Sequence, residues 1–487
     1  MTGFEIISQI MAVLLAVAGI YFLISSLDNL FIEILYFAWR VFYEPSFRKK
    51  HHLLTEANLA PENQQPIAIM VPLWRESNVI EGMLDYLMTH VNYKNYTIFA
   101  GVYPNDVETF EALKHEQKKY PEQIKIISMS HEGPTSKDDC LNSLVQAIHQ
   151  YEAENGTQFQ IFVIHDAEDL VPKDGLLVFN HLIPRHDFVQ LPVFPAPTPW
   201  YRLIAGHYMD EFAQSHLKEM RLREWLTGSI PSAGVGVAMS RRALAVSKEI
   251  NNGKYFPTNT VTADYELPLQ LYNAGLKSIF FDVNVDADKY HLTKSTFLEH
   301  HQHSPATKSL FPDNFFSSVR QKSRWIVGIV FEGWEHLHWR GTLYNRYFLY
   351  RDRKALIGHL MTMLGYILFI MVSAFWLIQA INPNTEMTVA KIVPAEGALW
   401  YLLYVNLWLM LVQLGVRVIT TFELYGFLHA IMSIPRLIVG SLINFVATIR
   451  ALGLYISYKR QGLDVLPWDK TVGHRLPAKK WARRNRG

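Results

Sequence analysis

Residues 160–169 read QIFVIHDAED, an apolar run that leads straight into three carboxylates. Gln160–Ile164 is short and rich in β-branched and aromatic residues, which predicts a buried strand. The carboxylates of Asp166, Glu168 and Asp169 repel one another, so this turn costs stability unless a cation lies beside it. Carboxylate oxygens suit Mg²⁺ or Mn²⁺. We therefore expect a divalent-metal site after this strand, with a solvated acidic turn as the alternative.

Similar short apolar runs recur through the middle of the chain. Further strands are predicted at Ile67–Val71, Tyr96–Val102, Ile124–Met129 and Lys277–Asp282. Polar stretches of helical character lie between them, at Val79–His90, Asp106–Lys119 and Ser136–Tyr151. This alternation predicts an α/β fold, with a mostly parallel sheet and helices on its faces. Ligands of such sheets bind at the carboxyl ends of the strands, so the residues that follow each strand are candidate site residues.

Three earlier strand ends carry polar candidates. Glu76 follows the first strand, where a solvated helix start is the alternative reading. Asp106 follows the second strand and either caps the next helix or accepts hydrogen bonds from a nucleoside. Lys137 follows a Gly-Pro turn at a predicted helix start, where backbone donors and a cation suit a diphosphate. An ordinary capped helix fits Lys137 equally well, and the GxxxxGK[ST] spacing of a P-loop is absent.

Two later segments complete the candidate site. Asp264 lies at or just before a predicted helix start and is our candidate for a general base. Gln321, Arg324 and Trp325 are spaced i, i+3 and i+4 on a predicted helix, so they share one face. An amide, a cation and an indole together suit sugar stacking and diphosphate contact. The alternative is a basic helix at a membrane surface.

Long apolar runs lie at both ends of the chain, and about 20 such residues span a bilayer. Spans are predicted at Ile6–Leu27, Ala355–Ile381 and Leu399–Val416. The first has no basic segment before it and no obvious cleavage site after it, so we interpret it as an anchor rather than a signal peptide. Leu30–Phe42 is amphipathic and either lies in the membrane interface or extends the first helix.

A fourth apolar stretch, Gly426–Tyr455, contains Pro435, Arg436 and Arg450. Lys and Arg flank the middle region, whereas the loop around Thr385 is poor in them, so the positive-inside rule places the middle region in the cytosol. A full fourth span would export the basic tail. We therefore expect a broken helix that lies in the cytosolic interface.

Composition limits the class of protein. The 487 residues carry a formal net charge of only +2, which argues against a nucleic-acid partner. Cys140 is the single cysteine, so no disulfide forms within the chain, as in a reducing cytosol. We divide the chain into an amino-terminal helix and linker, a cytosolic α/β domain, membrane and interfacial helices, and a basic tail with the motif WDKT, at residues 1–45, 46–350, 351–458 and 459–487.

In this order the motifs resemble those of glycosyltransferase family 2. The shared pattern is an Asp after the second strand, a Lys-containing turn, a DxD-like cluster, a late acidic base and a QxxRW helix, here Gln321–Trp325. The last element resembles that of membrane-integrated polysaccharide synthases such as cellulose and hyaluronan synthases. The resemblance runs from Ile67 to Thr471, which is most of the chain.

The resemblance implies a GT-A (Rossmann-like) fold and an inverting transfer from a UDP-sugar, with a UDP-N-acetylhexosamine favoured. The residues that it assigns to the nucleotide sugar are Glu76, Asp106, Lys137 and Asp166. The residues that it assigns to Mg²⁺ or Mn²⁺ are Asp166, Glu168 and Asp169. Asp264 takes the role of catalytic base. The residues that it assigns to the acceptor entrance, the leaving diphosphate or a gate over the donor are Gln321, Arg324, Trp325, Trp468 and Lys470.

Two departures from the family pattern are Arg75 in place of Asn and Ala263 in place of Glu. Because the base is kept, we expect an active enzyme that builds an exported polysaccharide at a bacterial inner membrane. Its expected partners are a growing glycan or lipid-linked acceptor, membrane lipids and, for an exported polymer, an outer-membrane export protein. The alternatives are a single transfer to a lipid carrier and an inactive membrane scaffold or receptor component. The sequence ends soon after Thr471, so we expect no further carboxy-terminal module.

Overall fold

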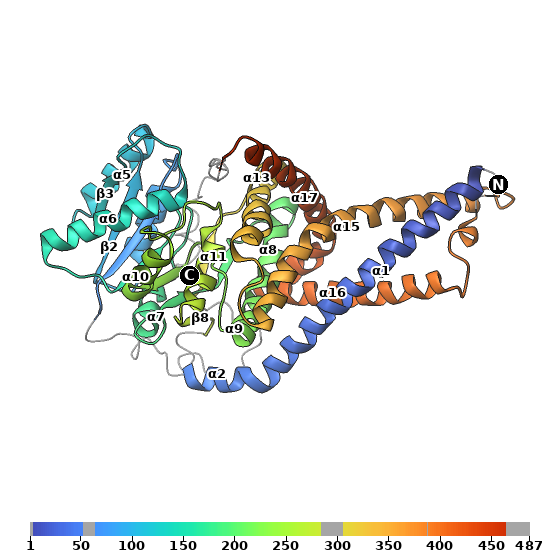
Figure 1. Ribbon diagram of the computed structural model, residues 1–487, viewed down its shortest axis with the longest axis horizontal. Coiled ribbons are helices and arrows are strands. Elements are labelled where there is room, and N and C mark those ends of the chain that lie inside the picture. Colours follow the sequence, from blue (N-terminus) through green and yellow to red (C-terminus); the bar gives the residue numbers. More distant parts are fainter. Residues whose placement is uncertain (1–2, 52–63, 284–304, 387, 464–487) are drawn as a thin grey trace.

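The computed structural model describes residues 3–51, 64–283, 305–386 and 388–463. An α/β region occupies one end, and a stalk of long helices extends from it (Figure 1). Trp468, Lys470 and the basic tail lie outside the described residues, so the expected gate over the donor stays a prediction.

The α/β region is built on a seven-stranded sheet in the order β3-β2-β1-β4-β7-β5-β8. The strands are β1 (Ile67–Pro72), β2 (Tyr96–Val102), β3 (Ile124–Ser128), β4 (Ile161–Ile164), β5 (Phe188–Gln190), β7 (Val237–Ser240) and β8 (Ser278–Phe280). All neighbouring pairs are parallel except those that β7 makes with β4 and β5. The predicted, mostly parallel sheet is therefore confirmed, with one antiparallel strand that the sequence pattern did not indicate.

Helices cover both faces of the sheet, because successive residues of each strand point to opposite sides. In β1, Ile67 and Ile69 pack on one face with α4 (Ile80–His90), α5 (Val107–Lys119) and α7 (Gly175–Leu182). Ala68 and Met70 pack on the other face with α6 (Lys137–Asn155), α10 (Arg241–Ile250) and α11 (Ala263–Asn273). The three helices predicted between the early strands are thus confirmed, and β1 is buried on both sides, as is usual in a parallel sheet.

A second layer joins the sheet to the stalk. It contains a two-stranded sheet of β6 (Val193–Pro195) and β9 (Thr307–Ser309). Its helical segments are α8 (Leu203–Gln214), η2 (Ser215–Glu219), α9 (Met220–Thr227), α13 (Phe315–Ile326), η4 (Val327–Glu332) and α14 (Gly333–Leu337). The helix that carries Gln321, Arg324 and Trp325 therefore lies at the membrane side of the α/β region (Figure 1).

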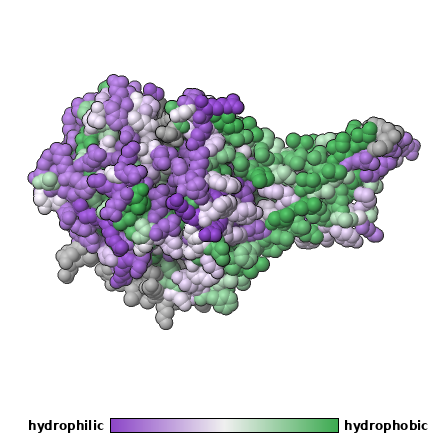
Figure 2. All heavy atoms as spheres, viewed as in Figure 1, coloured by the Kyte–Doolittle hydropathy of each residue, from purple (hydrophilic) through white to green (hydrophobic). Residues whose placement is uncertain are grey.

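The stalk consists of α1 (Gly3–Ala38), α15 (Leu343–Ile381) and α16 (Ala398–Tyr425), which run side by side (Figure 1). Their exposed surface is apolar over most of its length (Figure 2). The first helix continues through the π-helical segment η1 (Trp39–Tyr43) into α2 (Glu44–His51). Leu30–Phe42 therefore extends the first helix. The expected linker before residue 46 is helical, and the boundary expected after residue 350 falls inside α15.

The last helix, α17 (Phe427–Arg460), corrects one expectation. It is a single helix with Pro435 inside it, not a broken one. Side chains add hydrogen bonds to the backbone on either side of the proline: Arg417 donates to the Ser433 carbonyl at 3.3 Å, and the Ser433 hydroxyl donates to the Ala430 carbonyl at 2.6 Å.

By length and composition, four helices among the described residues can cross a membrane, and α17 is one of them. Its contacts nevertheless keep it against the α/β region along its length. Arg436 meets α8, Asn444 meets both α8 and α13, and Lys459 meets α14. The opposite face exposes a row of large apolar residues, namely Ile431, Ile438, Leu442, Ile449, Leu452 and Ile456. This two-sided pattern is typical of a helix that lies in a membrane interface, and α17 does not run along the outer stalk (Figure 1).

Candidate active site

A cleft opens where the carboxyl end of β4 meets the start of α11. Its empty space, including the open mouth, is about 480 Å³. Its lining includes the start of α6, the end of β4, residues of β5 and β7, the loop before β7, and the start of α11 with the segment that precedes it. Its polar lining residues are Lys137, Asp138, Ser232 and Asp264. The position at strand ends is where ligands of such sheets bind.

Lys137, which lines this cleft, forms an ion pair with Asp166, which lies outside the lining. The Lys137 Nζ lies 2.6 Å from the Asp166 Oδ1 and donates a second hydrogen bond, at 3.0 Å, to the Gly234 carbonyl. Burial would lower the pKa of Lys137, but Asp166 outweighs this effect and the pKa rises to about 12. The ammonium is therefore charged at neutral pH. Ser136 caps the same helix by accepting from the Asp139 N–H, so the capping alternative is also realised.

Asp264 lines the cleft from the first turn of α11. Its Oδ1 accepts from the Tyr265 N–H at 2.9 Å. Gly234 lies directly against it, because a Cβ at that position would come within 2.4 Å of the Asp264 Oδ2. Burial raises the pKa of the Asp264 carboxyl to about 6, although Lys137 acts in the opposite direction. Glu266, the nearest competing carboxylate, turns away and contacts the His336 Nδ1 at 3.0 Å.

Asp138 is the second carboxyl group that lines the cleft, and no sequence pattern singled it out. It is buried beside Lys137. Burial, reinforced by Asp264, raises the pKa of Asp138 to about 8. Its side chain is therefore mostly protonated at neutral pH and can donate a hydrogen bond, which an ionised carboxylate cannot do.

The acidic turn after β4 presents its side chains alternately. Asp166 and Glu168 are partly exposed, whereas His165, Ala167 and Asp169 are buried. The Asp169 Oδ2 accepts from the Asp166 N–H at 3.0 Å and lies 3.2 Å from the His165 Nδ1. Asp166 and Glu168 thus offer oxygen ligands on the open side, which suits Mg²⁺ or Mn²⁺, while Asp169 shapes the turn from inside.

A different trio is close enough to share one ion in the part of the chain that the structure describes. Its members are Glu81, His115 and Glu116, on α4 and α5. Glu116 is already paired with Lys119, whose Nζ lies 2.6 Å from its Oε1. This trio lies on the outer helices and not at the strand ends, so it is not the metal site that the sequence predicts.

Asp106 and Glu76 lie at the neighbouring strand ends and do not line the cleft. Asp106 is the N-cap of α5: its Oδ1 accepts from the Thr109 N–H at 3.4 Å and its Oδ2 from the Arg75 N–H at 2.5 Å. Arg75 has a φ of 56°, a left-handed conformation that is uncommon for a residue with a side chain. Glu76 is buried, and its N–H donates to the Thr109 hydroxyl at 2.9 Å. The cap expected as one role of Asp106 is present, and its nucleoside contact stays a prediction.

Gln321, Arg324 and Trp325 lie on α13, outside the lining of the cleft. The Trp325 ring packs against Tyr208 and Phe212 of α8 at centroid distances of 6.2 and 6.3 Å. The π-helical segment η4 continues α13 and reaches the cleft: Gly328 packs against Thr262, and the Glu332 Oε2 accepts from the Val261 N–H at 2.8 Å. These contacts fix α13 to the segment that precedes Asp264.

Comparisons with known proteins agree with this arrangement. Residues 161–379, from β4 to α15, match the model of the glycosyl transferase family group 2. The chain carries a glycosyltransferase family 2 domain. It is 35% identical over 480 residues, 98% of its length, to bacteriophage adsorption protein B of Escherichia coli strain K12. It has the same identity and coverage with bacteriophage N4 adsorption protein B of E. coli O157:H7. The chain spans 63% of the length of these two relatives.

Solved structures give weaker similarities to the family 2 domain. The mannosyltransferase PcManGT from Pyrobaculum calidifontis, in complex with GDP-Man and Mn²⁺, has a TM-score of 0.49 and 14% identity, covering 86% of this chain and 99% of that one. Residues 1–349 of TarS from S. aureus, in complex with UDP, have a TM-score of 0.32 and 12% identity, covering 55% of this chain and 68% of that one. The sheet and the family match together confirm the expected GT-A fold class.

The family 2 match includes Asp166, Asp264 and α13, whereas Lys137 precedes it. Of the site residues predicted from the sequence, Lys137 and Asp264 line one cleft, and Asp166 is paired with Lys137 beside it. Sequence reasoning missed Asp138 and Gly234. The available signal was the pair of glycines in residues 231–236, which read PSAGVG. Gly234 has a φ of 78°, and its backbone lies directly against the Asp264 side chain.

Proposed function

We propose that the chain transfers a sugar, with inversion, from a UDP-sugar to a growing glycan or a lipid-linked acceptor at the inner membrane. The observation that carries this proposal is the cleft in which Asp264 faces the Lys137–Asp166 pair. The family 2 match and the identity to the two adsorption proteins support it. A UDP-N-acetylhexosamine remains the favoured donor, and an exported polysaccharide the favoured product.

Asp264 acts as the general base in this proposal. Its carboxylate accepts the proton of the acceptor hydroxyl as that oxygen bonds to the anomeric carbon, and the bond from that carbon to the diphosphate breaks to release UDP. A pKa of about 6 leaves Asp264 mostly ionised at neutral pH but more basic than an exposed carboxylate. The Gly234 backbone at its side limits the positions that the carboxylate can take.

Lys137 and Asp166 form the donor side. The Lys137 ammonium is the cation that lines the cleft, and it is placed to contact the diphosphate by charge-assisted hydrogen bonds. Asp166 and Glu168 would hold a divalent metal ion, which would neutralise charge on the leaving diphosphate. We expect exhaustive EDTA treatment to abolish turnover and added Mg²⁺ or Mn²⁺ to restore it. Turnover that survived EDTA would remove the metal from this proposal.

The four long apolar helices support a reaction at a membrane. We propose that the α/β region is cytosolic, with Thr385 on the opposite side, because Lys and Arg flank the α/β region. The acceptor then meets the enzyme on the α13 side, beside the membrane helices (Figure 1). An exported polymer would also need an export protein in the outer membrane.

Incubation of membranes that contain the chain with a panel of radiolabelled UDP-sugars tests the proposal. We expect one donor to give a labelled product, and product size separates the alternatives. A long polymer indicates processive synthesis, and a short organic-extractable product indicates single transfer to a lipid carrier. Equal labelling by the wild type and the Asp264→Asn variant, or no labelling from any donor, would leave a scaffold as the better account.

A further inference from the structure

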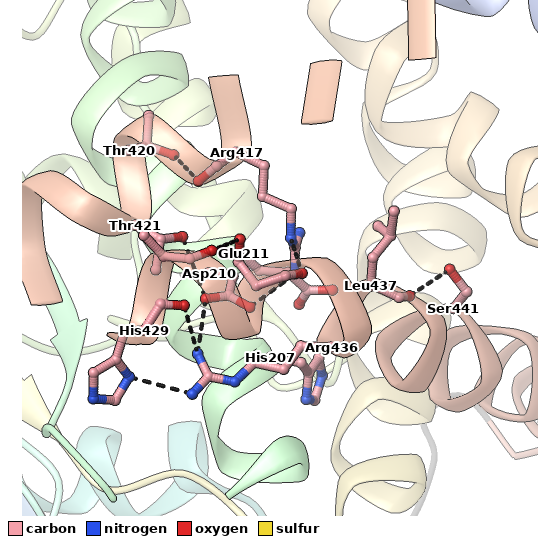
Figure 3. A network of polar contacts seen from close by, with 12 residues as sticks. His207, Asp210, Glu211, Arg417, Thr420, Thr421, His429, Arg436, Leu437 and Ser441 are labelled. Carbon is pink, nitrogen blue, oxygen red and sulfur yellow. Dashed lines mark hydrogen bonds and ion pairs between the residues drawn. The ribbon is translucent and has the colours of Figure 1, made fainter. Parts of the chain in front are cut away.

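A buried polar network joins the α/β region to the membrane helices (Figure 3). Its centre is Asp210, which is on α8 and fully buried. The Arg417 Nη2, from α16, lies 3.1 Å from the Asp210 Oδ2, and the Arg436 Nη1, from α17, lies 3.2 Å from its Oδ1. The Thr421 hydroxyl also donates to Asp210, at 3.3 Å. One carboxylate therefore ties three helices together.

The next residue on α8, Glu211, makes a second connection, and this one includes α13. The Lys322 Nζ lies 2.5 Å from the Glu211 Oε2 and 2.8 Å from the Asn444 Oδ1 of α17. The Asn444 Nδ2 donates to the Glu211 Oε1 at 3.3 Å, which closes a ring of three side chains from three helices. Lys322 is buried by this contact: its side chain is only 7% exposed.

Lys322 lies within the QKSRW segment but on a different face from Gln321 and Arg324. Lys322 and Ser323 are buried, whereas Gln321 and Arg324 are only partly buried. The Ser323 hydroxyl donates to the Ala447 carbonyl of α17 at 3.1 Å, next to the Lys322 contact. Two consecutive residues therefore hold one side of α13 against α17, and this fixes which way the other side points.

The same lysine also acts on Trp325 through Tyr208. The Lys322 Nζ lies 5.2 Å from the centre of the Tyr208 ring, and the Trp325 ring meets Tyr208 edge to face at 6.2 Å. Apolar residues of similar volume usually hold two helices together at least as well as a buried ion pair does. An ionic ring with defined hydrogen bonds instead selects one rotation and one register of the helix.

We propose that Lys322 is a positioning residue: through Glu211 and Asn444 it sets the rotation of α13, and thereby places Gln321, Arg324 and Trp325 for the acceptor. The role in transfer rests on the proposed function, whereas the effect on α13 itself does not. Loss of the ring leaves the Lys137–Asp166 pair in place, because both residues belong to other elements.

The test compares the full-length wild type with the variants Lys322→Met and Lys322→Arg in detergent-solubilised membranes. For Lys322→Met we expect incorporation from the preferred UDP-sugar to fall by about 10-fold or more, since small misplacements of a positioning group have effects of this size. The Kd for UDP should stay unchanged, and Lys322→Arg should restore most of the rate because it keeps the cation. Hydrogen–deuterium exchange should be faster in residues 315–326 of Lys322→Met.

Lys459→Met is the matched control. This lysine is also in an ion pair at α17, with its Nζ 2.7 Å from the Glu335 Oε2, but the pair is exposed. We expect it to change neither incorporation nor exchange in α13. If Lys322→Met does not accumulate, Asn444→Ala opens the same ring, and the same changes are expected at smaller size.

Unchanged exchange in α13, loss of UDP binding together with transfer, or an Arg variant as impaired as the Met variant would each overturn the positioning role. If the wild type incorporates no sugar, the proposed function fails. The exchange measurement then still decides whether Lys322 orders α13.

Discussion

The cleft and the membrane junction differ in how many cations contact their buried carboxylates. In the cleft, Asp138 and Asp264 share the neighbourhood of one cation, Lys137, and burial raises their pKa values to about 8 and 6. At the junction, Asp210 contacts two arginines and Glu211 contacts Lys322. Charge is thus under-compensated where chemistry is proposed and closely paired where helices must be held.

This difference helps to distinguish the carboxylates that are proposed to react from those that hold helices together. A carboxylate with a raised pKa lowers the stability of the fold, but it is a better proton acceptor. Burial also raises the pKa of Asp210 to about 6, although Arg417 and Arg436 act in the opposite direction, so its pKa does not distinguish it from Asp264. What distinguishes Asp210 is that its loss leaves two buried guanidinium groups without their carboxylate partner. Asp264→Asn should therefore lose activity and keep stability, and Asp210→Asn should lose stability and keep most of its activity.

The largest effect is expected at the base. Asp264→Asn keeps the shape of the side chain but cannot accept the acceptor proton, so kcat should fall by about 10²–10⁴-fold. The Kd for UDP should remain close to that of the wild type, and the thermal midpoint should not fall, because the ionised form of Asp264 lowers the stability of the fold. Glu266→Gln is the comparison variant, because Glu266 contacts His336 instead of the cleft. If Glu266→Gln abolished turnover while Asp264→Asn kept it, the base would be misassigned by two residues.

The next effect is expected at the junction. Asp210→Asn leaves Arg417 and Arg436 buried beside a neutral amide, which should destabilise the fold by about 3–5 kcal/mol. The thermal midpoint in detergent reports this loss, while turnover per folded molecule should change far less than in Asp264→Asn. Glu335→Gln removes the exposed pair with Lys459 and should cost about 1 kcal/mol or less. Equal midpoints for the two variants would contradict the contrast between the regions.

The smallest effect is expected at Asp138, in the cleft. The folded pKa of Asp138, about 8, lies above the unfolded value, so the folded state binds more protons and stability falls as pH rises toward 8. Asp138→Asn mimics the protonated form and removes this loss. Its thermal midpoint should match the wild type near pH 4 and exceed it at pH 8. Asp139→Asn, one residue on and outside the cleft lining, should show no such divergence.

Much of the fold was predictable because it follows local patterns. The early strands, β1 to β4, are apolar runs followed by turn residues, and the helices between them begin at recognisable caps such as Asp106 and Ser136. The short strands β5 and β7 were missed, since three or four residues carry no periodicity that separates them from loops. The break expected at Pro435 was wrong: α17 continues through the proline as a single helix, packed against α8, α13 and α14.

In the candidate site, too, only the residues that follow local patterns were predictable. Lys137, Asp166 and Asp264 each follow a strand or begin a helix, so their positions could be read from the chain. The burial that raises the pKa of Asp138, and the Glu211–Lys322 contact across 111 residues, depend on tertiary packing. No local pattern reports such contacts, which is why the junction was absent from the predicted site.

The most direct test of the account is the initial rate of UDP release against pH, for the wild type and Asp264→Asn in matched membranes with the preferred UDP-sugar. Because the base must be ionised, the wild-type kcat should rise with pH through about pH 6 and level off above it. Asp264→Asn should be slow throughout and lack this rise. A wild-type rate that was flat or rose toward acid, or a variant profile that coincided with it, would contradict the claim that this cleft is the active site and Asp264 its base.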